Sequence, residues 1–327
     1  MQYKPKNLKE KKSILYFNNL NFQKKNYNIL KSKFRVLNIN NVKNKDFSKI
    51  VSIVLPMNNF YSDKFFSKFP KLRSVVSPST GDIHLDKKYL KDKKIRILNL
   101  SKFKRKLNFI TSTSELTIGL ILNCTRRILK IHENFVNNRL FKKYNFLLSN
   151  KIFTLGIVGM GRIGQHVANR AKALGFNVIY FDPNINIKKF TKEKSFGKFI
   201  KKTNILTIHM HFKKKFYGKY NNKIFKNLKK PSFVINTSRG EFINESNLIN
   251  CLKKKIVNGA GLDVVVNEHT RKFRENPLSN KLVNFYNKSK NTNLFIAPKQ
   301  GGSNKSAWAY TEKLLINELV KYEKNRI

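Results

Sequence analysis

The sequence predicts an α/β protein built on parallel sheets. Short apolar runs alternate along the chain with longer amphipathic stretches, which is the pattern of repeated βαβ units. A glycine-rich turn near the middle of the chain joins one apolar run to an amphipathic stretch. The length of 327 residues is enough for two domains of ordinary size.

The first third of the chain predicts strands separated by helices. The expected strands are Ile14–Phe17, Val36–Ile39, Val51–Leu55, Ser74–Ser77 and Ile95–Leu100. The expected helices are Phe22–Phe34, Phe60–Phe69 and Leu85–Asp92. A longer helix is expected over Ser114–His132, because apolar residues recur there every four positions and basic residues gather near its end.

A second series of alternating elements begins at Ile152. It opens with the strand Phe153–Val158, the helix Arg162–Leu174, which Gly175 should end, and the strand Asn177–Phe181. The later expected strands are Ile205–Met210, Phe233–Asn236, Gly261–Val266 and Leu294–Ala297. The later expected helices are Asn222–Lys229, Glu245–Lys254 and Ala307–Tyr322.

Composition excludes several classes of protein. With 40% hydrophobic and 12% aromatic residues, the chain is not expected to be disordered. Its most apolar run, Leu116–Leu122, is too short to span a membrane, and the polar, basic segment Met1–Lys12 is not a secretory signal. Cys124 and Cys251 lie far apart and form no CxxC motif. We therefore expect no disulfide framework, no metal site and a cytoplasmic location.

The charge balance is unusual, because 68 Lys and Arg residues face 18 Asp and Glu residues, a formal charge of +50. Such an excess suggests a polyanionic partner. Lys, Asn, Ile and Phe are all abundant, however, and all four are encoded by AT-rich codons. The basic residues are also dispersed, with no basic tail, RNP-like motif or zinc finger. Codon bias is therefore the favoured explanation, and nucleic-acid binding is the least favoured function.

The glycine-rich turn has the form of a phosphate-binding loop. Gly159, Gly161 and Gly164 follow an expected strand and open an expected helix. In that context glycines permit a tight turn, close approach of a pyrophosphate and close packing of helix on strand, while the helix N-terminus favours the phosphate charge. Asp182 ends the next expected strand, where a carboxylate can bind the adenosine ribose and repel a 2′-phosphate. NAD(H) is therefore expected rather than NADP(H).

Several spaced motifs resemble those of the D-isomer-specific 2-hydroxyacid dehydrogenases, especially the phosphoglycerate dehydrogenase-like branch. They are the loop Val76–Asp86, the segment Ser114–Arg127, the arginine motif Asn236–Gly240, the acidic motif Gly259–Glu268 and the final motif Pro298–Gly302. The resemblance implies two doubly wound parallel-sheet domains. One is a Rossmann NAD-binding domain over residues 118–298, and the other is a flavodoxin-like substrate domain made of residues 1–117 and 299–327. It also implies a homodimer.

The resemblance further implies the site. Thr80 and Gly81 would bind the substrate carboxylate, and Arg239 would contact its carboxylate and carbonyl oxygens. Glu268 would orient and charge the proton donor. The residues implied near the cofactor are Gly159, Gly161, Arg162, Ile163, Gly164, Asp182, His209, Thr237 and Asp263. A lone histidine in an apolar strand, such as His209, is more often structural than functional.

The sequence departs from the family at the catalytic histidine, because Lys299 occupies that position and no histidine follows His269. Lysine ordinarily has a pKa near 10.4 and is a poor base at neutral pH. Burial and a nearby Arg239 would lower the pKa of such a lysine, whereas Glu268 would raise it. One reading is an active reductase with Lys299 as the acid. The alternative is a catalytically impaired, NAD-binding regulatory protein of the same fold.

The substrate implied by the resemblance is a small anionic 2-oxo acid and its D-2-hydroxy acid. The pair 3-phosphohydroxypyruvate and 3-phosphoglycerate would suit a basic site. Only one helix is expected after Gly302, however, so a regulatory domain like that of long phosphoglycerate dehydrogenases is not expected. Glyoxylate, hydroxypyruvate and sugar-derived 2-oxo acids stay open.

Overall fold

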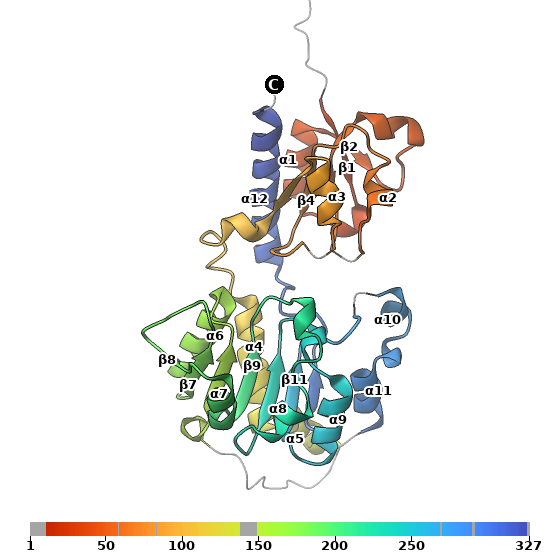
Figure 1. Cartoon of the computed structure of the whole chain (residues 1–327). Coiled ribbons are helices and arrows are strands. Elements are labelled where there is room, and N and C mark those ends of the chain that lie inside the picture. Colours follow the sequence, from red (N-terminus) through yellow and green to blue (C-terminus); the bar gives the residue numbers. More distant parts are fainter. Residues whose placement is uncertain are drawn as a thin grey trace, which may run out of the picture. The chain divides into compact units, whose positions relative to one another are not determined.

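The structure, a computed structural model, describes residues 11–57, 59–82, 84–137, 149–268, 270–289 and 292–325. The chain divides into two compact units, which are described separately below (Figure 1). The terminal unit comprises Met1–Ile110 and Asn304–Ile327, and the central unit comprises Thr111–Ser303. Each unit is built around one parallel sheet, so the expected α/β architecture with two parallel sheets is confirmed.

The terminal unit holds a five-stranded sheet in the order β2-β1-β3-β4-β5. Its strands are β1 (Ser13–Tyr16), β2 (Arg35–Asn38), β3 (Ile50–Val54), β4 (Ser74–Ser77) and β5 (Arg96–Asn99). The central strands β1, β3 and β4 are buried along their whole length, as expected for a sheet covered on both faces.

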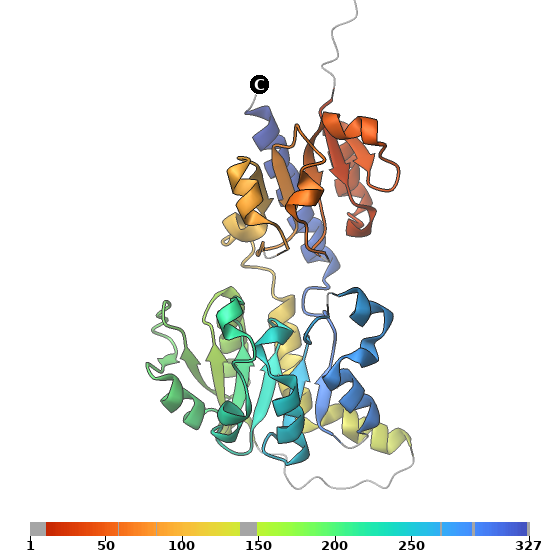
Figure 2. The same ribbon diagram turned by 45° about the vertical axis from the view of Figure 1, so that its right-hand side comes forward.

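Helices cover both faces of this sheet. On one face α1 (Lys24–Lys33) and α12 (Lys305–Lys324) pack Leu30 and Leu315 into a cluster with Ile14 and other strand residues. On the other face α2 (Asp63–Phe66) and α3 (Lys87–Asp92) pack against Leu15 and its neighbours (Figure 2). The short 3-10 turns η1 (Asn18–Leu20), η2 (Asn44–Lys49) and η3 (Leu100–Phe103) connect these elements.

The central unit holds a seven-stranded sheet in the order β12-β11-β10-β9-β6-β7-β8. Its strands are β6 (Thr154–Val158), β7 (Asn177–Phe181), β8 (Thr191–Lys192), β9 (Ile205–Ile208), β10 (Phe233–Asn236), β11 (Gly259–Leu262) and β12 (Leu294–Ile296). The strand order reverses between β6 and β9. In open α/β sheets, ligands bind outside the carboxyl ends of the strands at such a reversal.

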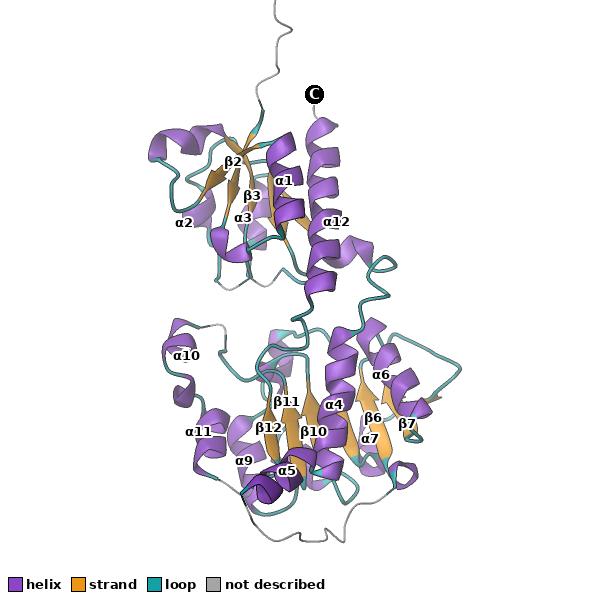
Figure 3. Cartoon of the chain, turned by 180° about the vertical axis from the view of Figure 1, so that it is seen from behind, coloured by secondary structure: helices purple, strands orange, loops and turns teal. Residues whose placement is uncertain are grey.

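Both faces of the central sheet are covered by helices. One face carries α4 (Ser112–Arg126) and α6 (Arg162–Ala173), as Figure 3 shows, and α5 (Ile128–Val136) follows α4 without burying a residue. The opposite face carries α7 (Phe196–Lys202), α8 (Asn222–Lys226) and α9 (Glu245–Lys253) (Figure 1). The remaining elements are α10 (Arg271–Glu275), α11 (Lys281–Lys288), η4 (Asn150–Ile152), η5 (Lys214–Phe216), η6 (Gly240–Phe242) and η7 (Pro277–Ser279).

Some expected boundaries were wrong. The long helix expected over Ser114–His132 breaks at Arg127, whose φ of 53° is left-handed and ends α4 before α5 begins. The strand expected over Gly261–Val266 instead covers Gly259–Leu262, because its pairing with β10 and β12 ends there. The helix expected over Phe60–Phe69 shrinks to Asp63–Phe66, and the short elements β8, α7 and α11 were not expected.

Among the described residues, no helix is both long enough and apolar enough to cross a membrane.

Candidate functional site

The residues expected to form a site in the central unit gather at the carboxyl edge of its sheet. The glycine turn follows β6, Asp182 follows β7, and His209 follows β9. Thr237 and Arg239 follow β10, while Asp263 follows β11. They gather because parallel strands end at the same edge, so residues far apart in sequence meet there.

The glycine turn has the geometry that a pyrophosphate needs. Gly159 has a φ of +91°, and a Cβ there would lie 2.8 Å from the backbone of His209. A Cβ on Gly164 would lie only 2.1 Å from the carbonyl oxygen of Gly159, so α6 and the turn touch backbone to backbone. A Cβ on Gly161, in contrast, would meet nothing within 4 Å. The glycine-only geometry and the open space above Gly161 fit a dinucleotide phosphate group.

The N-terminus of α6 faces this turn without a side-chain cap. Gly161 is the capping residue and, as a glycine, has no side chain that could accept a hydrogen bond from the first turn of the helix. Arg162 and Ile163, the first helical residues, are half-buried, and burial lowers the pKa of Arg162. Uncapped amides at a helix N-terminus favour an anion.

Asp182 ties the loop after β7 to the glycine turn. Its Oδ2 accepts a hydrogen bond of 2.8 Å from the amide of Met160, inside the turn. Its Oδ1 accepts hydrogen bonds of 2.9 and 3.0 Å from the amides of Asn184 and Ile185. The carboxylate is thus held beside the phosphate loop, at the position where such an acid binds ribose hydroxyls.

His209 and Thr237 are both tied to neighbouring side chains. His209 Nε2 lies 2.9 Å from Thr207 Oγ1, and desolvation of the half-buried imidazole lowers the pKa of His209 to about 3. This histidine therefore stays neutral at physiological pH and stabilises the end of β9. Thr237 is buried, and its Oγ1 lies 2.9 Å from Thr117 Oγ1 on α4. Neither contact requires a ligand.

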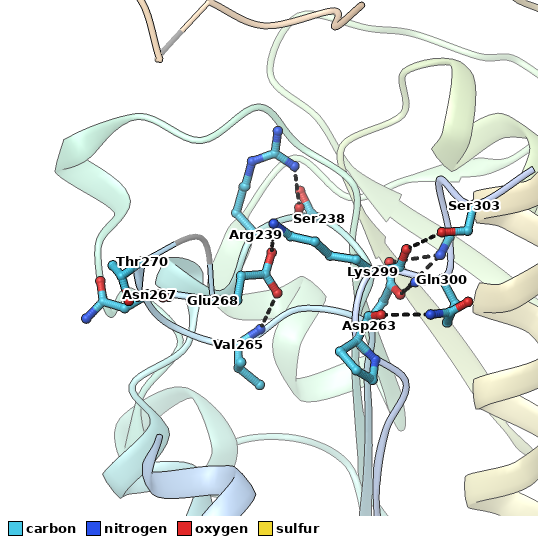
Figure 4. Close-up of polar contacts among 12 residues, drawn as sticks. Ser238, Arg239, Asp263, Val265, Asn267, Glu268, Thr270, Lys299, Gln300 and Ser303 are labelled. Atoms are coloured by element: carbon cyan, nitrogen blue, oxygen red, sulfur yellow. Dashed lines mark hydrogen bonds and ion pairs between the residues drawn. The ribbon is translucent and has the colours of Figure 1, made fainter. Parts of the chain in front are cut away.

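Lys299 and Glu268 form an ion pair, in which Lys299 Nζ lies 3.6 Å from Glu268 Oε1 (Figure 4). The Glu268 side chain is 11% exposed, whereas the Lys299 side chain is 56% exposed. The Lys299 side chain is therefore mostly exposed to solvent. Arg239 is exposed, and its Nη1 donates a hydrogen bond of 2.8 Å to the carbonyl of Ser238. The guanidinium thus turns back toward its own backbone.

The loop that carries Lys299 wraps around Asp263. The amide of Lys299 donates to the carbonyl of Asp263 at 2.8 Å, and Lys299 has a left-handed φ of 55°. Asp263 Oδ1 accepts hydrogen bonds of 2.6 Å from the amide of Gln300 and 3.1 Å from that of Gly301. Ser303 Oγ closes the loop by donating to the carbonyl of Lys299 at 2.8 Å. Asp263 therefore holds the loop of residues 299–303 in place through these hydrogen bonds.

Burial perturbs both carboxyl groups of this cluster. It raises the pKa of Asp263 to about 6, although the amides of Gly301 and Gln300 and the charge of Lys299 act in the opposite direction. Burial also raises the pKa of Glu268 above its ordinary value, against the lowering effects of Lys299 and the amide of Val265. Paired perturbed carboxyl groups at the edge of a sheet mark a functional site.

The expected carboxylate-binding residues belong to the terminal unit. Thr80 and Gly81 follow β4, in a turn where Ser79 Oγ donates to the carbonyl of Gly81 and Ser77 Oγ lies 2.8 Å from His84 Nε2. Within the described part of the chain, the amides of Thr80 and Gly81 donate no hydrogen bond. Two unused amides in one turn can bind an anion.

Some residues of the site were not identified from the sequence, and one candidate lies outside the described residues. Gly240, Glu245 and Asn280 surround the turn that carries Glu268, and of these three only Gly240 belongs to a motif, the arginine motif. The one signal for Glu245 was its charge, since it is one of 18 acidic residues in a basic chain and lies five residues after Gly240 of the arginine motif. His269 lies outside the described residues. No group of three or more metal-binding side chains occurs among the residues that are described.

Comparison with known proteins relates both sequence and fold to one family. Residues 118–296 match the family described as "D-isomer specific 2-hydroxyacid dehydrogenase, NAD binding domain". The chain is 28% identical over 272 residues to the glyoxylate reductase of Thermococcus litoralis, a match that covers 79% of this chain and 76% of that protein.

Two solved structures share the fold. The D-lactate dehydrogenase of Aquifex aeolicus, complexed with NAD and lactic acid, aligns with a TM-score of 0.82 at 18% identity, covering 95% of this chain and 96% of that one. The D-isomer specific 2-hydroxyacid dehydrogenase of Lactobacillus delbrueckii ssp. bulgaricus, in its NAD-complexed form, aligns with a TM-score of 0.77 at 17% identity, covering 96% and 97% of the two chains. At these identities the likeness concerns the fold alone.

Proposed function

The chain belongs to the D-isomer specific 2-hydroxyacid dehydrogenase family, and from this premise we propose that it reduces a small 2-oxo acid with Lys299 as the proton donor. As a member of the family it is an oxidoreductase that acts on CH–OH donors with NAD as its cofactor. The observation that carries the proposal is the ion pair of 3.6 Å between Lys299 and Glu268.

We propose that the carboxyl edge of the central sheet holds the cofactor. Gly159, Gly161 and Gly164, with the first amides of α6 at Arg162 and Ile163, would hold its pyrophosphate, and Asp182 would hold its adenosine ribose. Thr237, His209 and Asp263 would line the nicotinamide. When bound, NADH supplies a hydride to C2 of the 2-oxo acid.

The protein has three tasks in such a reaction: to hold the carboxylate, to stabilise the developing alkoxide and to supply its proton. The amides of Thr80 and Gly81, which donate to no other described residue, suit the first task. Arg239 would contact the carboxylate and carbonyl oxygens with its planar guanidinium, which requires it to leave the carbonyl of Ser238.

Lys299 would give its proton to the alkoxide oxygen as the hydride reaches C2, which leaves a neutral amine and a 2-hydroxy acid. Glu268 supports this role through its position, because its carboxylate lies 3.6 Å from the Nζ atom and would direct it. Because Lys299 is 56% exposed, bulk water can return a proton to the amine after each turnover.

The domain roles follow the same proposal. Residues 118–298 would form the NAD-binding domain, and residues 1–117 with 299–327 would form the substrate domain. The branch and substrate stay proposals too. A phosphorylated acid such as 3-phosphohydroxypyruvate suits the net charge of +50. Glyoxylate, which names the relative in Thermococcus litoralis, is the second candidate.

We also propose that the protein is a homodimer, with α5 in the interface. Large apolar side chains of α5 face solvent: Ile128 is 53% exposed, Phe135 73% and Val136 61%. Such a cluster on a helix is typical of a surface that another chain covers. Light scattering should give the mass of a dimer for the wild type and of a monomer for Phe135→Glu.

The cysteines Cys124 and Cys251 are both free and buried, which supports a cytoplasmic location.

The test of the proposed reaction is NADH oxidation in the presence of glyoxylate, pyruvate, hydroxypyruvate or 3-phosphohydroxypyruvate. The wild type, Lys299→Ala and Lys299→His would be compared. Lys255→Ala is a matched control, because Lys255 is also exposed and has a left-handed φ of 54°. We expect turnover by the wild type and by Lys255→Ala, and a loss of about 100-fold in kcat for Lys299→Ala.

Equal rates for the wild type and Lys299→Ala would refute the role of Lys299. An inactive wild type that gains activity with Lys299→His would instead support the alternative function, a catalytically impaired protein that binds NAD. The resemblance places Lys299 where the family has its histidine, and this expected replacement is what supports the second candidate.

A further inference from the structure

The proposed chemistry leaves one buried carboxylate without a role. Glu245 is the first residue of α9 and is only 8% exposed. Burial raises the pKa of its carboxyl group. A buried carboxylate costs folding free energy unless hydrogen bonds compensate, so its partners show what it is used for.

Those partners lie in the turn that follows β11. Glu245 Oε1 accepts a hydrogen bond of 2.8 Å from the amide of Val266. Asn280 Nδ2 donates to Glu245 Oε1 and Oε2 at 2.9 and 3.0 Å, and it also donates to the carbonyl of Val266 at 3.2 Å. Glu245 and Asn280 therefore hold the N–H and the C=O of Val266 between them.

Val266 lies close to Glu268, so the hydrogen bonds that fix Val266 also affect the position of Glu268. The two residues lie in one tight turn, in which Asn267 has a left-handed φ of 60°. Within the turn the amide of Val265 donates to Glu268 Oε2 at 3.2 Å, so the Glu268 carboxylate folds back onto the backbone of the turn (Figure 4). A shift of the Val265–Val266 peptide would therefore move the carboxylate that faces Lys299.

The same peptide packs on the connection that carries Arg239. A Cβ on Gly240 would lie 2.1 Å from the carbonyl carbon of Val265 and 2.5 Å from the amide nitrogen of Val266. Gly240 directly follows Arg239, and Glu245 ends the same connection between β10 and α9. The Arg239 connection thus touches the Glu268 turn at Gly240 and is hydrogen-bonded to it at Glu245.

We propose that Glu245 and Asn280 are positioning residues that fix the turn bearing Glu268 against the connection bearing Arg239. They touch neither substrate nor cofactor in this scheme. Their effect on the reaction passes through the place of the Glu268 carboxylate beside Lys299. This inference rests on the proposed reductase function, and it adds residues that the family motifs did not single out.

The test compares Glu245→Ala, Glu245→Gln and Asn280→Asp, with Ser246→Ala on the same helix as the control. Glutamine keeps an oxygen for the Val266 amide. Asn280→Asp keeps the Oδ1 atom that caps α11 through the amides of Leu282 and Val283, but sets a second carboxyl group against Glu245.

We expect Glu245→Ala and Asn280→Asp to lower kcat about 10-fold or more, because a small misplacement of a reacting group carries such a penalty. The KM for NADH should change by less than about 2-fold, because the cofactor site is not involved. Glu245→Gln should recover most of the wild-type kcat, because glutamine keeps an oxygen for the amide of Val266. Placing Glu245→Ala in a Glu268→Gln background should then change kcat by less than about 2-fold, because residues that act through one another are non-additive.

Amide hydrogen exchange of residues 264–268 gives a readout that does not need turnover. Faster exchange there in Glu245→Ala, with unchanged exchange in β6 and α6, would support the structural part even if the wild type proved inactive. An inactive wild type would thus refute the proposed function, not the hold on the turn. An unchanged kcat in Glu245→Ala would overturn the inference. A loss equally large in the Glu268→Gln background would overturn it as well, since it would indicate general destabilisation.

Discussion

Lys299 Nζ lies 3.6 Å from Glu268 Oε1, and the two partners stand in different surroundings. The carboxylate is 11% exposed, while the ammonium-bearing side chain is 56% exposed. Water screens an ion pair with one exposed partner, so it adds little to folding stability. Its effect on protonation is larger, because burial opposes the charge on Glu268 and the lysine supports it.

The first prediction concerns the pH dependence of reduction. Burial raises the pKa of Glu268 above 4.5, so the ionised form is lost at a higher pH than for an exposed glutamate as the pH falls. We expect kcat/KM to decline on the acid side through that raised pKa. Glu268→Gln should lower the plateau about 10-fold and remove the decline, because glutamine does not titrate.

Rates measured from pH 4.5 to pH 8 in buffers of constant ionic strength would check this prediction. Lys255→Ala should retain the wild-type profile, since that lysine belongs to a different connection. An acid-side decline that survives unchanged in Glu268→Gln would assign it to another group.

The second prediction concerns stability and Asp263. Its folded-state pKa is raised to about 6 from an ordinary value of 3.8, so the protonated form is the one that folding favours. Its stabilising contribution is therefore present below pH 4 and is lost as the pH rises to about 6. Two pKa units correspond to about 3 kcal/mol.

Asp263→Asn removes this titration but can keep an oxygen for the amides of Gln300 and Gly301. As the pH rises from 4 to 7, the wild type should lose stability relative to the variant. The difference in unfolding free energy should shift in favour of the variant by up to about 3 kcal/mol. Urea unfolding at several pH values would measure the difference. A difference between the two proteins that stays constant with pH would refute the raised pKa.

The parts of the site that sequence could predict are those made by local geometry. A strand, a turn with glycines at fixed spacing and a helix determine one another, so the turn at Gly159–Gly164 and the helix Arg162–Ala173 agree with expectation. The place of Asp182 beside the turn could be predicted, because it directly follows the adjacent strand. The hold of Glu245 on Val266 could not, since a backbone amide carries no sequence signal for a partner 21 residues away.

The exposure of Lys299 and the break in the long helix could not be predicted from the sequence either. The sequence left open whether burial acts on Lys299, and its left-handed loop around Asp263 directs the side chain outward to 56% exposure. The break at Arg127 follows no proline or glycine, and the apolar repeat continues across it. Periodicity identifies a helical face, and it does not reveal where one left-handed residue divides the helix.

The third prediction concerns nucleotide selectivity. Asp182 receives three backbone amides, so Asp182→Ala should loosen the glycine turn and remove the charge that opposes a 2′-phosphate. We expect NADH to bind about 10-fold more weakly, with a smaller loss for NADPH. Fluorescence titration with both nucleotides would show the change as a ratio. Equal losses for NADH and NADPH would mean that the carboxylate does not select between them.

The last prediction separates the two roles of glycine in the phosphate loop. A Cβ at Gly164 would lie 2.1 Å from the carbonyl oxygen of Gly159, which is backbone and cannot move aside cheaply. Gly164→Ala should therefore lower the melting temperature by several degrees and weaken NADH binding together. A Cβ at Gly161 meets nothing within 4 Å, and no left-handed φ is required there.

Gly161→Ala should consequently leave the melting temperature of the unliganded protein within about 2 °C of the wild type, because the new methyl group enters open space. That space is where the pyrophosphate would approach the helix N-terminus, so the same methyl group should weaken NADH binding about 10-fold or more. Thermal unfolding with and without NADH measures both effects on one sample. If Gly161→Ala bound NADH as tightly as the wild type, the pyrophosphate would have to lie elsewhere, and the cofactor assignment of the glycine turn would fail with it.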